Sequence, residues 1–266
     1  LVSRIQSKLE VCKGRSRKAL ISFITAGDPT TEHTIPALHA LVQGGVDIIE
    51  LGIPFSDPEA EGPSIQKSSQ RALENGVGLD SVLRMVQEFR EKDPETPIVL
   101  MGYLNSILSM TDFAEKASNS GVDGLIVVNL PPEEAEDLQS SLRRNDIDLI
   151  YLLAPTTTEK RSALIAEKAS GFLYYVSLKG ITGAGHIEVD KVASRIESLR
   201  EMTDLPLCVG FGIKNAKTAT EIGKFSDGVV VGSALVDLMS ESEDVNFTAK
   251  ELELAVSSIR QGLDSI

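Results

Sequence analysis

Acidic residues cluster in the stretch from residue 47 to residue 66, which reads DIIELGIPFSDPEAEGPSIQ. Glu50 ends an apolar run, and Asp57, Glu59 and Glu61 follow it in a loop rich in glycine and proline. A carboxyl group becomes an effective proton donor and acceptor near neutral pH when burial raises its pKa. We therefore expect the pKa of Glu50 to be raised, which makes Glu50 a candidate functional residue. The alternative is that Glu50 pairs with a lysine and that the loop acids are only solvated.

A second set of residues could bind phosphate without basic side chains. Glycines end two apolar runs, in VGFGIKNA (209–216) and VVGSALVDL (230–238), and a helical pattern follows each. Glycine lets a phosphate approach backbone N–H groups closely, and the N-terminus of a helix adds positive potential. A third glycine-rich stretch, KGITGAGH (179–186), strengthens the prediction. The alternative is that these glycines only form tight turns.

A repeating fold must position these residues. Short apolar runs recur eight times, and most are apolar at consecutive positions, which is typical of parallel strands covered on both faces. Helical patterns lie between them; in the segment 80–89, for example, Val82, Val86 and Phe89 form one stripe. The runs cover residues 19–25, 46–52, 97–103, 124–130, 148–154, 172–178, 206–212 and 228–234.

Eight strand–helix units without a linker predict a closed (β/α)₈ TIM barrel, an α/β fold, as a single domain over residues 1–266. An extra N-terminal helix, Ser3–Cys12, should cap the bottom of the barrel, and a short phosphate-binding helix should begin near Ser233. Thr111 is expected to cap the helix of TDFAEKASNSG. Active sites of such barrels lie at the C-terminal ends of the strands, so Glu50 and the glycine-rich loops should meet at one mouth.

The overall composition excludes several function classes. The chain has 266 residues, is 42% hydrophobic and carries a net charge of −13, which argues against nucleic-acid binding. No apolar run approaches the length of a membrane span, and no signal-peptide pattern is present, so we expect a cytoplasmic protein. Cys12 and Cys208 are expected to be reduced thiols. The three histidines show no metal-ligand spacing, and no metal is expected.

Taken together, the motifs resemble the tryptophan synthase α subunit family. They occur in the family's order across essentially the whole chain: FITAGDP (23–29), IELGIPFSDP (49–58), GPSIQ (62–66), LPPEE (130–134), YYVSLKGITGA (174–184), GFGI (210–213) and VGSALV (231–236). The resemblance implies retro-aldol cleavage of indole-3-glycerol phosphate to indole and glyceraldehyde 3-phosphate, in tryptophan biosynthesis. It further implies that indole passes to a β subunit within an αββα assembly. Pyridoxal phosphate would belong to that partner, and this chain would hold no cofactor.

The resemblance also implies roles for individual residues. Glu50 would be the general acid–base, Glu61 would accept the indole N–H, and Tyr174 would lie close to Glu50 and the substrate. Thr182 would hydrogen-bond Glu61 on loop closure, and loop 54–62 would face the β subunit. The substrate-binding residues would be Phe23, Ile65, Tyr103 and Leu153 around the indole, Asn129 and Thr182 nearby, and Gly183, Phe211, Gly212, Gly232 and Ser233 around the phosphate.

Departures from the family pattern leave other interpretations open. Glu61 stands where the family has aspartate, so its carboxylate extends about 1.5 Å farther. Glu59 replaces a leucine, and Asn129 replaces an aspartate. One alternative is a weakly active or inactive subunit that mainly activates the β subunit. Another is a different phosphosugar barrel, such as an isomerase or indoleglycerol-phosphate synthase. The synthase would need a catalytic lysine at the end of a strand, but the lysines lie mainly in helical stretches, with Lys179, just past a predicted strand, as the exception.

Overall fold

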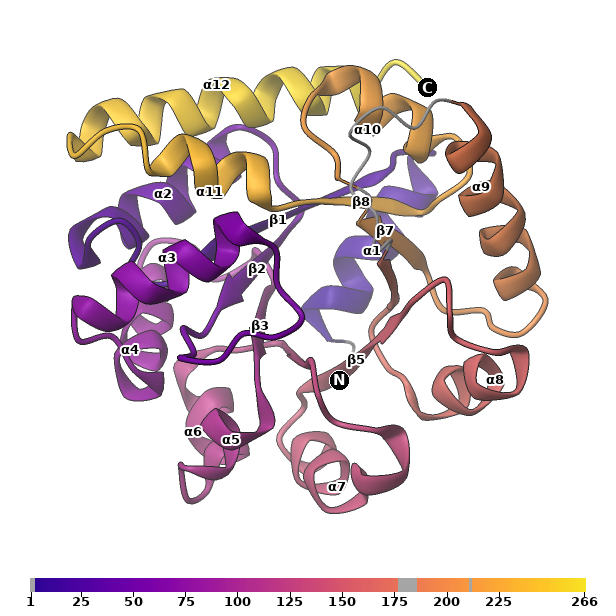
Figure 1. Cartoon of the computed structure of the whole chain (residues 1–266), viewed down its shortest axis with the longest axis horizontal. Helices are drawn as coiled ribbons and strands as arrows, with labels where there is room; N and C mark the ends of the chain where they lie inside the picture. The colour runs from indigo at the N-terminus through magenta and orange to yellow at the C-terminus, as the bar shows by residue number, and fades with distance from the viewer. Residues whose placement is uncertain (1–2, 177–185, 211) are drawn as a thin grey trace.

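The computed structural model describes residues 3–176, 186–210 and 212–266. Within these ranges eight parallel strands close into a barrel in chain order (Figure 1), which confirms the predicted (β/α)₈ fold. The predicted residues Thr182, Gly183 and Phe211 lie outside the described residues. The strands are β1 (Ala19–Thr25), β2 (Ile48–Gly52), β3 (Ile98–Gly102), β4 (Gly124–Val127), β5 (Asp148–Leu153), β6 (Leu173–Val176), β7 (Leu207–Gly210) and β8 (Gly228–Val231).

Helices surround the barrel and close one end of it (Figure 1). The predicted N-terminal helix is α1, whose Ile5, Leu9 and Cys12 are buried against the barrel interior. The predicted short helix after the last strand is α11. The described helices are α1 (Arg4–Gly14), α2 (Thr31–Gln43), α3 (Pro63–Glu74), α4 (Leu79–Arg90), α5 (Leu104–Leu108), α6 (Phe113–Ser120), η1 (Pro132–Glu134), α7 (Glu136–Arg144), α8 (Glu159–Lys168), α9 (His186–Arg200), α10 (Ala216–Gly223), α11 (Ser233–Met239) and α12 (Val245–Leu263).

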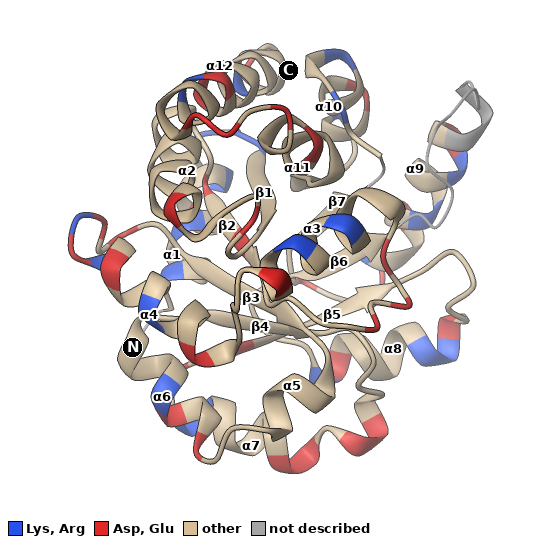
Figure 2. Cartoon of the chain, turned by 60° about the vertical axis from the view of Figure 1, so that its left-hand side comes forward, with Lys and Arg blue, Asp and Glu red and all other residues tan. Residues whose placement is uncertain are grey.

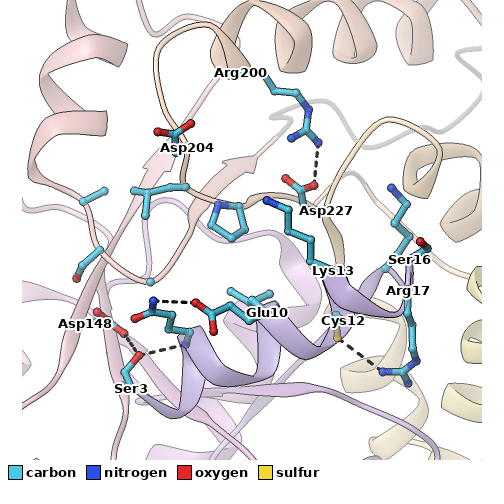
Figure 3. A pocket seen from close by; sticks show the side chains of 18 residues that line it. Ser3, Glu10, Cys12, Lys13, Ser16, Arg17, Asp148, Arg200, Asp204 and Asp227 are labelled. Carbon is cyan, nitrogen blue, oxygen red and sulfur yellow. Dashed lines mark hydrogen bonds and ion pairs between the residues drawn. The ribbon is translucent and has the colours of Figure 1, made fainter. Parts of the chain in front are cut away.

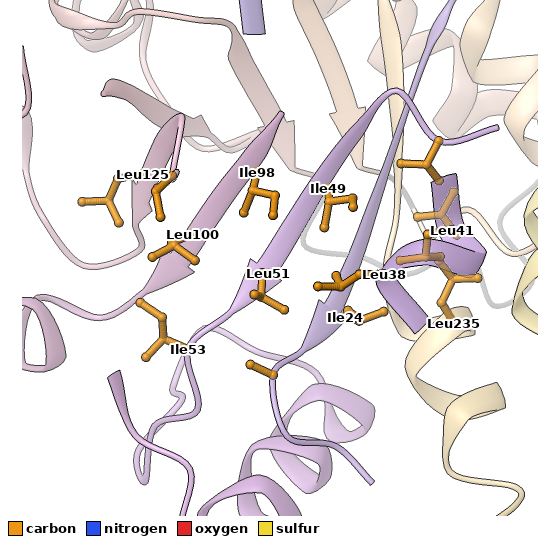
Figure 4. Packing of buried hydrophobic residues seen from close by; sticks show 14 of the residues in the cluster. Ile24, Leu38, Leu41, Ile49, Leu51, Ile53, Ile98, Leu100, Leu125 and Leu235 are labelled. Carbon is orange, nitrogen blue, oxygen red and sulfur yellow. The ribbon is translucent and has the colours of Figure 1, made fainter. Parts of the chain in front are cut away.

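Alternate residues of each strand face opposite sides of the barrel wall. Hydrophobic residues of the strands and the surrounding helices form one large cluster outside the barrel wall, the outer cluster. Figure 4 shows Ile49 and Leu51 of β2 in it, where they lie with Leu38 of α2. Glu50 stands between them in the strand, so its side chain faces the barrel interior. The inner cluster at the bottom of the barrel consists of Ile5, Leu9, Cys12, Ala19, Ile21, Ile48, Val99, Ile126, Ile150, Phe172, Cys208 and Val230.

Three aspartates share one structural role at the bottom of the barrel. Each precedes a strand and accepts a hydrogen bond from the first or second backbone N–H of the neighbouring strand. These bonds satisfy amides that have no partner within the sheet. Some of the acidic residues behind the net negative charge therefore have a structural role in the barrel. The pairs are Leu20 N–H with Asp47 (2.9 Å), Ile98 N–H with Asp123 (2.8 Å) and Leu207 N–H with Asp227 (2.8 Å).

The start of α6 differs from the prediction, whereas the start of α10 agrees with it. Asp112, not Thr111, is the N-cap of α6; it has φ of 57° and makes no side-chain capping hydrogen bond. The expected Thr111 cap is therefore wrong. Asn215 caps α10 through a reciprocal pair of side-chain bonds with Thr218, so a helix does follow the glycine-rich end of β7.

Candidate active site

Glu50 is a buried carboxyl without a partner. Its side chain is 1% exposed, and neither carboxyl oxygen has a hydrogen-bond partner in the part of the chain that the structure describes. Burial, reinforced by the nearby charge of Glu61, raises the pKa of Glu50 to about 8. The group is therefore protonated at neutral pH and can donate a proton. Pairing with a lysine, the alternative drawn from the sequence, does not occur among the described residues.

Glu61 reaches the barrel mouth from the loop that follows β2. Burial raises its pKa to about 7, and its charge acts on both Glu50 and Tyr174. The backbone of Glu61 is held twice: its N–H donates to the Pro58 carbonyl at 3.0 Å, and its carbonyl accepts from the Gln66 side chain at 2.9 Å. The other loop acids, Asp57 and Glu59, are exposed, so the solvated interpretation holds for them and fails for Glu61.

Tyr174 brings a phenol to the same place from β6. Burial first, and the charges of Glu50 and Glu61 next, raise the pKa of Tyr174 well above its ordinary value, so the phenol is neutral. Tyr174 packs against the inner cluster and touches the backbone of β7 at Gly210. The structure thus brings together the three residues predicted to be catalytic.

A small cavity joins the predicted indole-binding residues. Phe23, Ile65 and Tyr103 line it together with Glu61, and its volume is about 10 Å³. This is room for about one water molecule, so the cavity must widen before an indole ring can enter. The full lining is Phe23, Thr25, Gly52, Ile53, Pro58, Glu61, Ile65, Ser69, Met101, Gly102 and Tyr103.

Leu153 does not belong to this set. It is 1% exposed and packs in the outer cluster, between strand β5 and the helices. Its neighbour Leu152 instead packs with the inner cluster beside Met101 and Tyr174. The expectation that Leu153 lines the indole pocket is therefore wrong, because strand alternation turns it away from the interior.

Asn129 lies just past β4 and is exposed at the same end of the barrel. Its side-chain oxygen accepts a hydrogen bond from the backbone N–H of Leu104 at 2.8 Å. Leu104 is the first residue of α5, so Asn129 satisfies one of the free amides at that helix start. The structure assigns this side chain a structural contact; its predicted contact with substrate stays a prediction.

The predicted phosphate-binding glycines lie where β7 and β8 end. Gly212 has φ of 55°, a left-handed conformation that favours glycine. Gly232 precedes α11, and a Cβ atom there would lie 3.3 Å from the Cβ of Phe23. The first amides of α11 have no acceptor within the helix and can bind an anion. Phosphate binding by Gly212, Gly232 and Ser233 stays a prediction that this geometry supports.

A larger cavity, of about 720 Å³, lies at the opposite end of the barrel, along α1 (Figure 3). Several polar groups that line it are already paired. Ser3 donates to Asp148 at 2.9 Å, and Arg200 contacts Asp227 at 3.0 Å. None of its lining side chains is among the buried polar groups that lack a partner in the described ranges. We therefore place the chemistry at the mouth, where Glu50 does lack one.

The outer helices carry both acidic and basic residues (Figure 2). Among the described residues no group of three or more His, Cys, Asp or Glu could hold a metal ion. Within the same ranges no helix combines the length and the apolar character that crossing a membrane requires.

Comparison with known proteins identifies the family. The family model for the tryptophan synthase alpha chain matches residues 9–263. The tryptophan synthase alpha chain of Marinobacter nauticus is 48% identical over 268 residues and covers 100% of this chain and 99% of that protein. That of Thioalkalivibrio sulfidiphilus is 50% identical over 266 residues, covering 99% and 100%. Among solved structures, the alpha subunit from Legionella pneumophila matches with a TM-score of 0.93 at 41% identity and 100% coverage of both chains.

Proposed function

The chain belongs to the tryptophan synthase alpha chain family and thus to the lyases of tryptophan biosynthesis, and from this premise we propose that it cleaves indole-3-glycerol phosphate to indole and glyceraldehyde 3-phosphate. The observation that carries the proposal is Glu50, a protonated carboxyl that lies buried in the barrel mouth and has no hydrogen-bond partner among the described residues. A buried carboxyl with a strongly raised pKa in a barrel mouth is typical of a catalytic acid or base, because its proton and lone pairs can serve a bound molecule.

The reaction needs one proton delivered and one removed. Glu50 donates its proton to C3 of the indole ring, which converts the ring to a positively charged leaving group. The resulting carboxylate then takes the proton of the hydroxyl on the adjacent glycerol carbon. The electrons of that O–H bond form the aldehyde carbonyl, the C–C bond breaks, and its electron pair returns to the ring. Glu50 ends protonated again, so one residue serves both steps.

Glu61 stabilises the charge that develops between the two proton transfers. As a carboxylate it accepts the indole N–H and offsets the positive charge on the ring, an interaction that strengthens in the transition state. Its pKa of about 7 lies below the value of about 8 for Glu50. Between these values the pair holds one proton, with Glu50 acidic and Glu61 ionised, which is the combination that the reaction needs. Tyr174, neutral and close to both, supplies a hydrogen-bonding hydroxyl.

The anionic end of the substrate would lie on the other side of the mouth. Backbone amides at Gly212, Gly232 and Ser233 would hold the phosphate, with no need for a basic cluster in a chain of net charge −13. Phe23 joins the two halves of this site. It is the register partner of Glu50 on β2, and it packs beside Gly232 at the end of β8. An indole against Phe23 would thus have its C3 near Glu50 and its side chain directed toward the phosphate site.

The product indole would pass to a β subunit, and pyridoxal phosphate would belong to that partner. Loop 54–62 is the proposed contact surface. Next to it lies α5, whose Leu108 is 69% exposed, an apolar side chain that a partner seated there would cover. Both elements follow the C-terminal ends of strands, so a partner seated there would cover the mouth of the barrel. We propose an αββα assembly because the chain belongs to the tryptophan synthase alpha chain family.

The proposal is tested by following indole release from indole-3-glycerol phosphate, with and without a β subunit. The full chain should release indole, and Glu50→Gln should reduce release at least ~10³-fold, because the amide can neither donate nor accept the proton. Glu91→Gln is the control: it removes an exposed acid at the end of α4, just before β3 and so away from the barrel mouth, and should leave the rate unchanged.

The same assay separates the alternative of a subunit that mainly activates its partner. In that case the chain would accelerate the β reaction but release no indole itself, and Glu50→Gln would change nothing. The position of Glu61 favours the lyase, because its carboxylate already lies at the mouth cavity despite the extra methylene.

A further inference from the structure

We propose that Tyr103 is a positioning residue that holds the loop between β2 and α3, residues 53–62, in the place where Glu61 enters the barrel mouth. The inference deepens the proposed lyase function and rests on it. It concerns the hydroxyl and the ring face of Tyr103, which act on the loop and not on the reacting atoms.

Two contacts join Tyr103 to the loop, one near each end. The backbone N–H of Ala60 donates a hydrogen bond to the Tyr103 hydroxyl at 3.1 Å. The ring of Phe55 stacks on the ring of Tyr103, with centroids 4.9 Å apart and an interplanar angle of 17°. Ala60 immediately precedes Glu61, so the first contact fixes the backbone from which the carboxylate extends. One side chain therefore spans the loop.

Tyr103 itself has a rigid base. It is 6% exposed, follows the last residue of β3, and is the N-cap of α5. The next residue, Leu104, donates its N–H to Asn129 beyond β4. The phenol is thus fixed to two adjacent strands of the barrel. A loop attached to it takes its position from the barrel wall, as a precisely placed catalytic group requires.

The loop needs such an attachment because it carries like charges. Asp57, Glu59 and Glu61 lie within five residues, and their mutual repulsion favours a loop that opens toward solvent. The Tyr103 hydroxyl can approach them because it is neutral: burial, together with the charges of Glu61, Glu59 and Asp57, raises its pKa above the ordinary value. A cation in this position would instead pair with the carboxylates and lower the pKa of Glu61.

Gln66 provides a second attachment on the other side of Glu61. Its side-chain amide donates to the Glu61 carbonyl at 2.9 Å, from the first turns of α3. The peptide before Glu61 is therefore held by Tyr103 and the peptide after it by Gln66. The motif GPSIQ contains this glutamine, but its role becomes visible only in the folded loop.

The test is Tyr103→Phe in the full chain, assayed with a β subunit. The ring stack is kept and only the acceptor for the Ala60 N–H is lost. We expect kcat to fall about 3- to 10-fold, the effect of one lost hydrogen bond, with KM changed much less. Amide hydrogen exchange at Ala60 should become faster. The acid limb of the pH profile should move to lower pH, because a loosened loop exposes Glu61 to water and lowers its pKa.

Tyr151→Phe is the matched control. It also removes a buried tyrosine hydroxyl, but one that has no hydrogen-bond partner in the described part of the chain, and it faces the outer cluster. It should change neither kcat nor the pH profile. Phe55→Leu, which removes the stack and keeps the hydrogen bond, should lower kcat in the same direction as Tyr103→Phe.

The proposal is overturned if Tyr103→Phe has the same kcat, the same hydrogen-exchange rate at the Ala60 amide and the same acid limb of the pH profile as the wild type. It is also overturned if the variant loses activity only through a lowered melting temperature with an unmoved pH profile. Failure of the lyase function itself is recognised separately, because the wild-type chain would then release no indole. The exchange rate of the Ala60 amide reports on the attachment in either case.

Discussion

A Cβ atom added at Gly210 would lie 2.5 Å from the hydroxyl oxygen of Tyr174. Gly210 ends β7, and Tyr174 lies on the neighbouring strand β6. The phenol of Tyr174 therefore packs directly on the backbone of β7 in the barrel mouth. The glycine is required here by close approach and not by its backbone angles, since Gly210 is not among the residues with positive φ.

Gly210→Ala should displace Tyr174 and disturb the charges around Glu50. We expect indole release to fall about 10- to 100-fold, the cost of shifting a group of the site by roughly an ångström. The fold should persist, as circular dichroism and a thermal melt would show. Gly14→Ala is the control, because a Cβ atom at Gly14 meets nothing within 4 Å. Equal rates for the two variants would contradict the close packing of Tyr174 on β7.

The pH dependence of cleavage should be bell-shaped with its maximum between pH 7 and 8. Below about pH 7 Glu61 takes up a proton and can no longer stabilise the indole cation. Above about pH 8 Glu50 loses the proton that it must donate. The two limbs describe the coupled pair. Measuring kcat/KM from pH 5.5 to 9.5 checks this, and an acid limb near the ordinary carboxyl value of 4.5 would contradict the burial of Glu61.

The barrel could be predicted from the sequence because each strand is a short, consecutively apolar run covered on both faces. The period of these runs and of the helical stripes is a local property of the chain. The placement of Glu50 follows as well, since strand ends meet at one face of a barrel. The exact ends of the strands could not be predicted from the sequence. The predicted strand 124–130, for example, ends at Val127, because Val128 and the residues after it turn toward η1.

The site was predicted less completely, because part of it depends on which side of a strand faces inward. Leu153 was placed in the indole pocket, but Leu152 is the interior residue, and a consecutively apolar strand gives no sign of its facing. The hydrogen bond from Ala60 to Tyr103 joins residues 43 apart in the chain. No local pattern records such a contact, so the residue types near the site were predictable and their pairings were not.

Glu61→Asp tests whether this chain has adapted to the longer acid. The loop is held on both sides of Glu61, by Tyr103 and by Gln66, so a loop shift that restored the reach of the shorter side chain would strain or break these two hydrogen bonds. We therefore expect the aspartate variant to release indole about 10-fold more slowly, although the family pattern has aspartate here. Steady-state rates with saturating β subunit provide the measurement. A faster variant would mean that the extra methylene is a cost that the loop has not offset.

Glu50→Gln should make the protein inactive and, at alkaline pH, more stable. The folded pKa of Glu50 is about 8, against an ordinary value of 4.5. In the unfolded chain the carboxyl ionises above pH 4.5, while the folded chain keeps its proton up to about pH 8. The unfolded state thus binds fewer protons in this window, and the free energy of unfolding falls as pH rises through it. The lost stability is on the order of 3–5 kcal/mol.

Glutamine does not titrate, so the variant avoids this loss. Urea denaturation at pH 5 should give nearly equal free energies of unfolding for the two proteins. At pH 9 the variant should be the more stable one by most of the expected difference. Glu59→Gln, an exposed acid of the neighbouring loop, should follow the wild type at both pH values. Parallel pH dependence of the wild type and Glu50→Gln would mean that Glu50 is ionised in the folded protein, and the proton donor would then have to be another group.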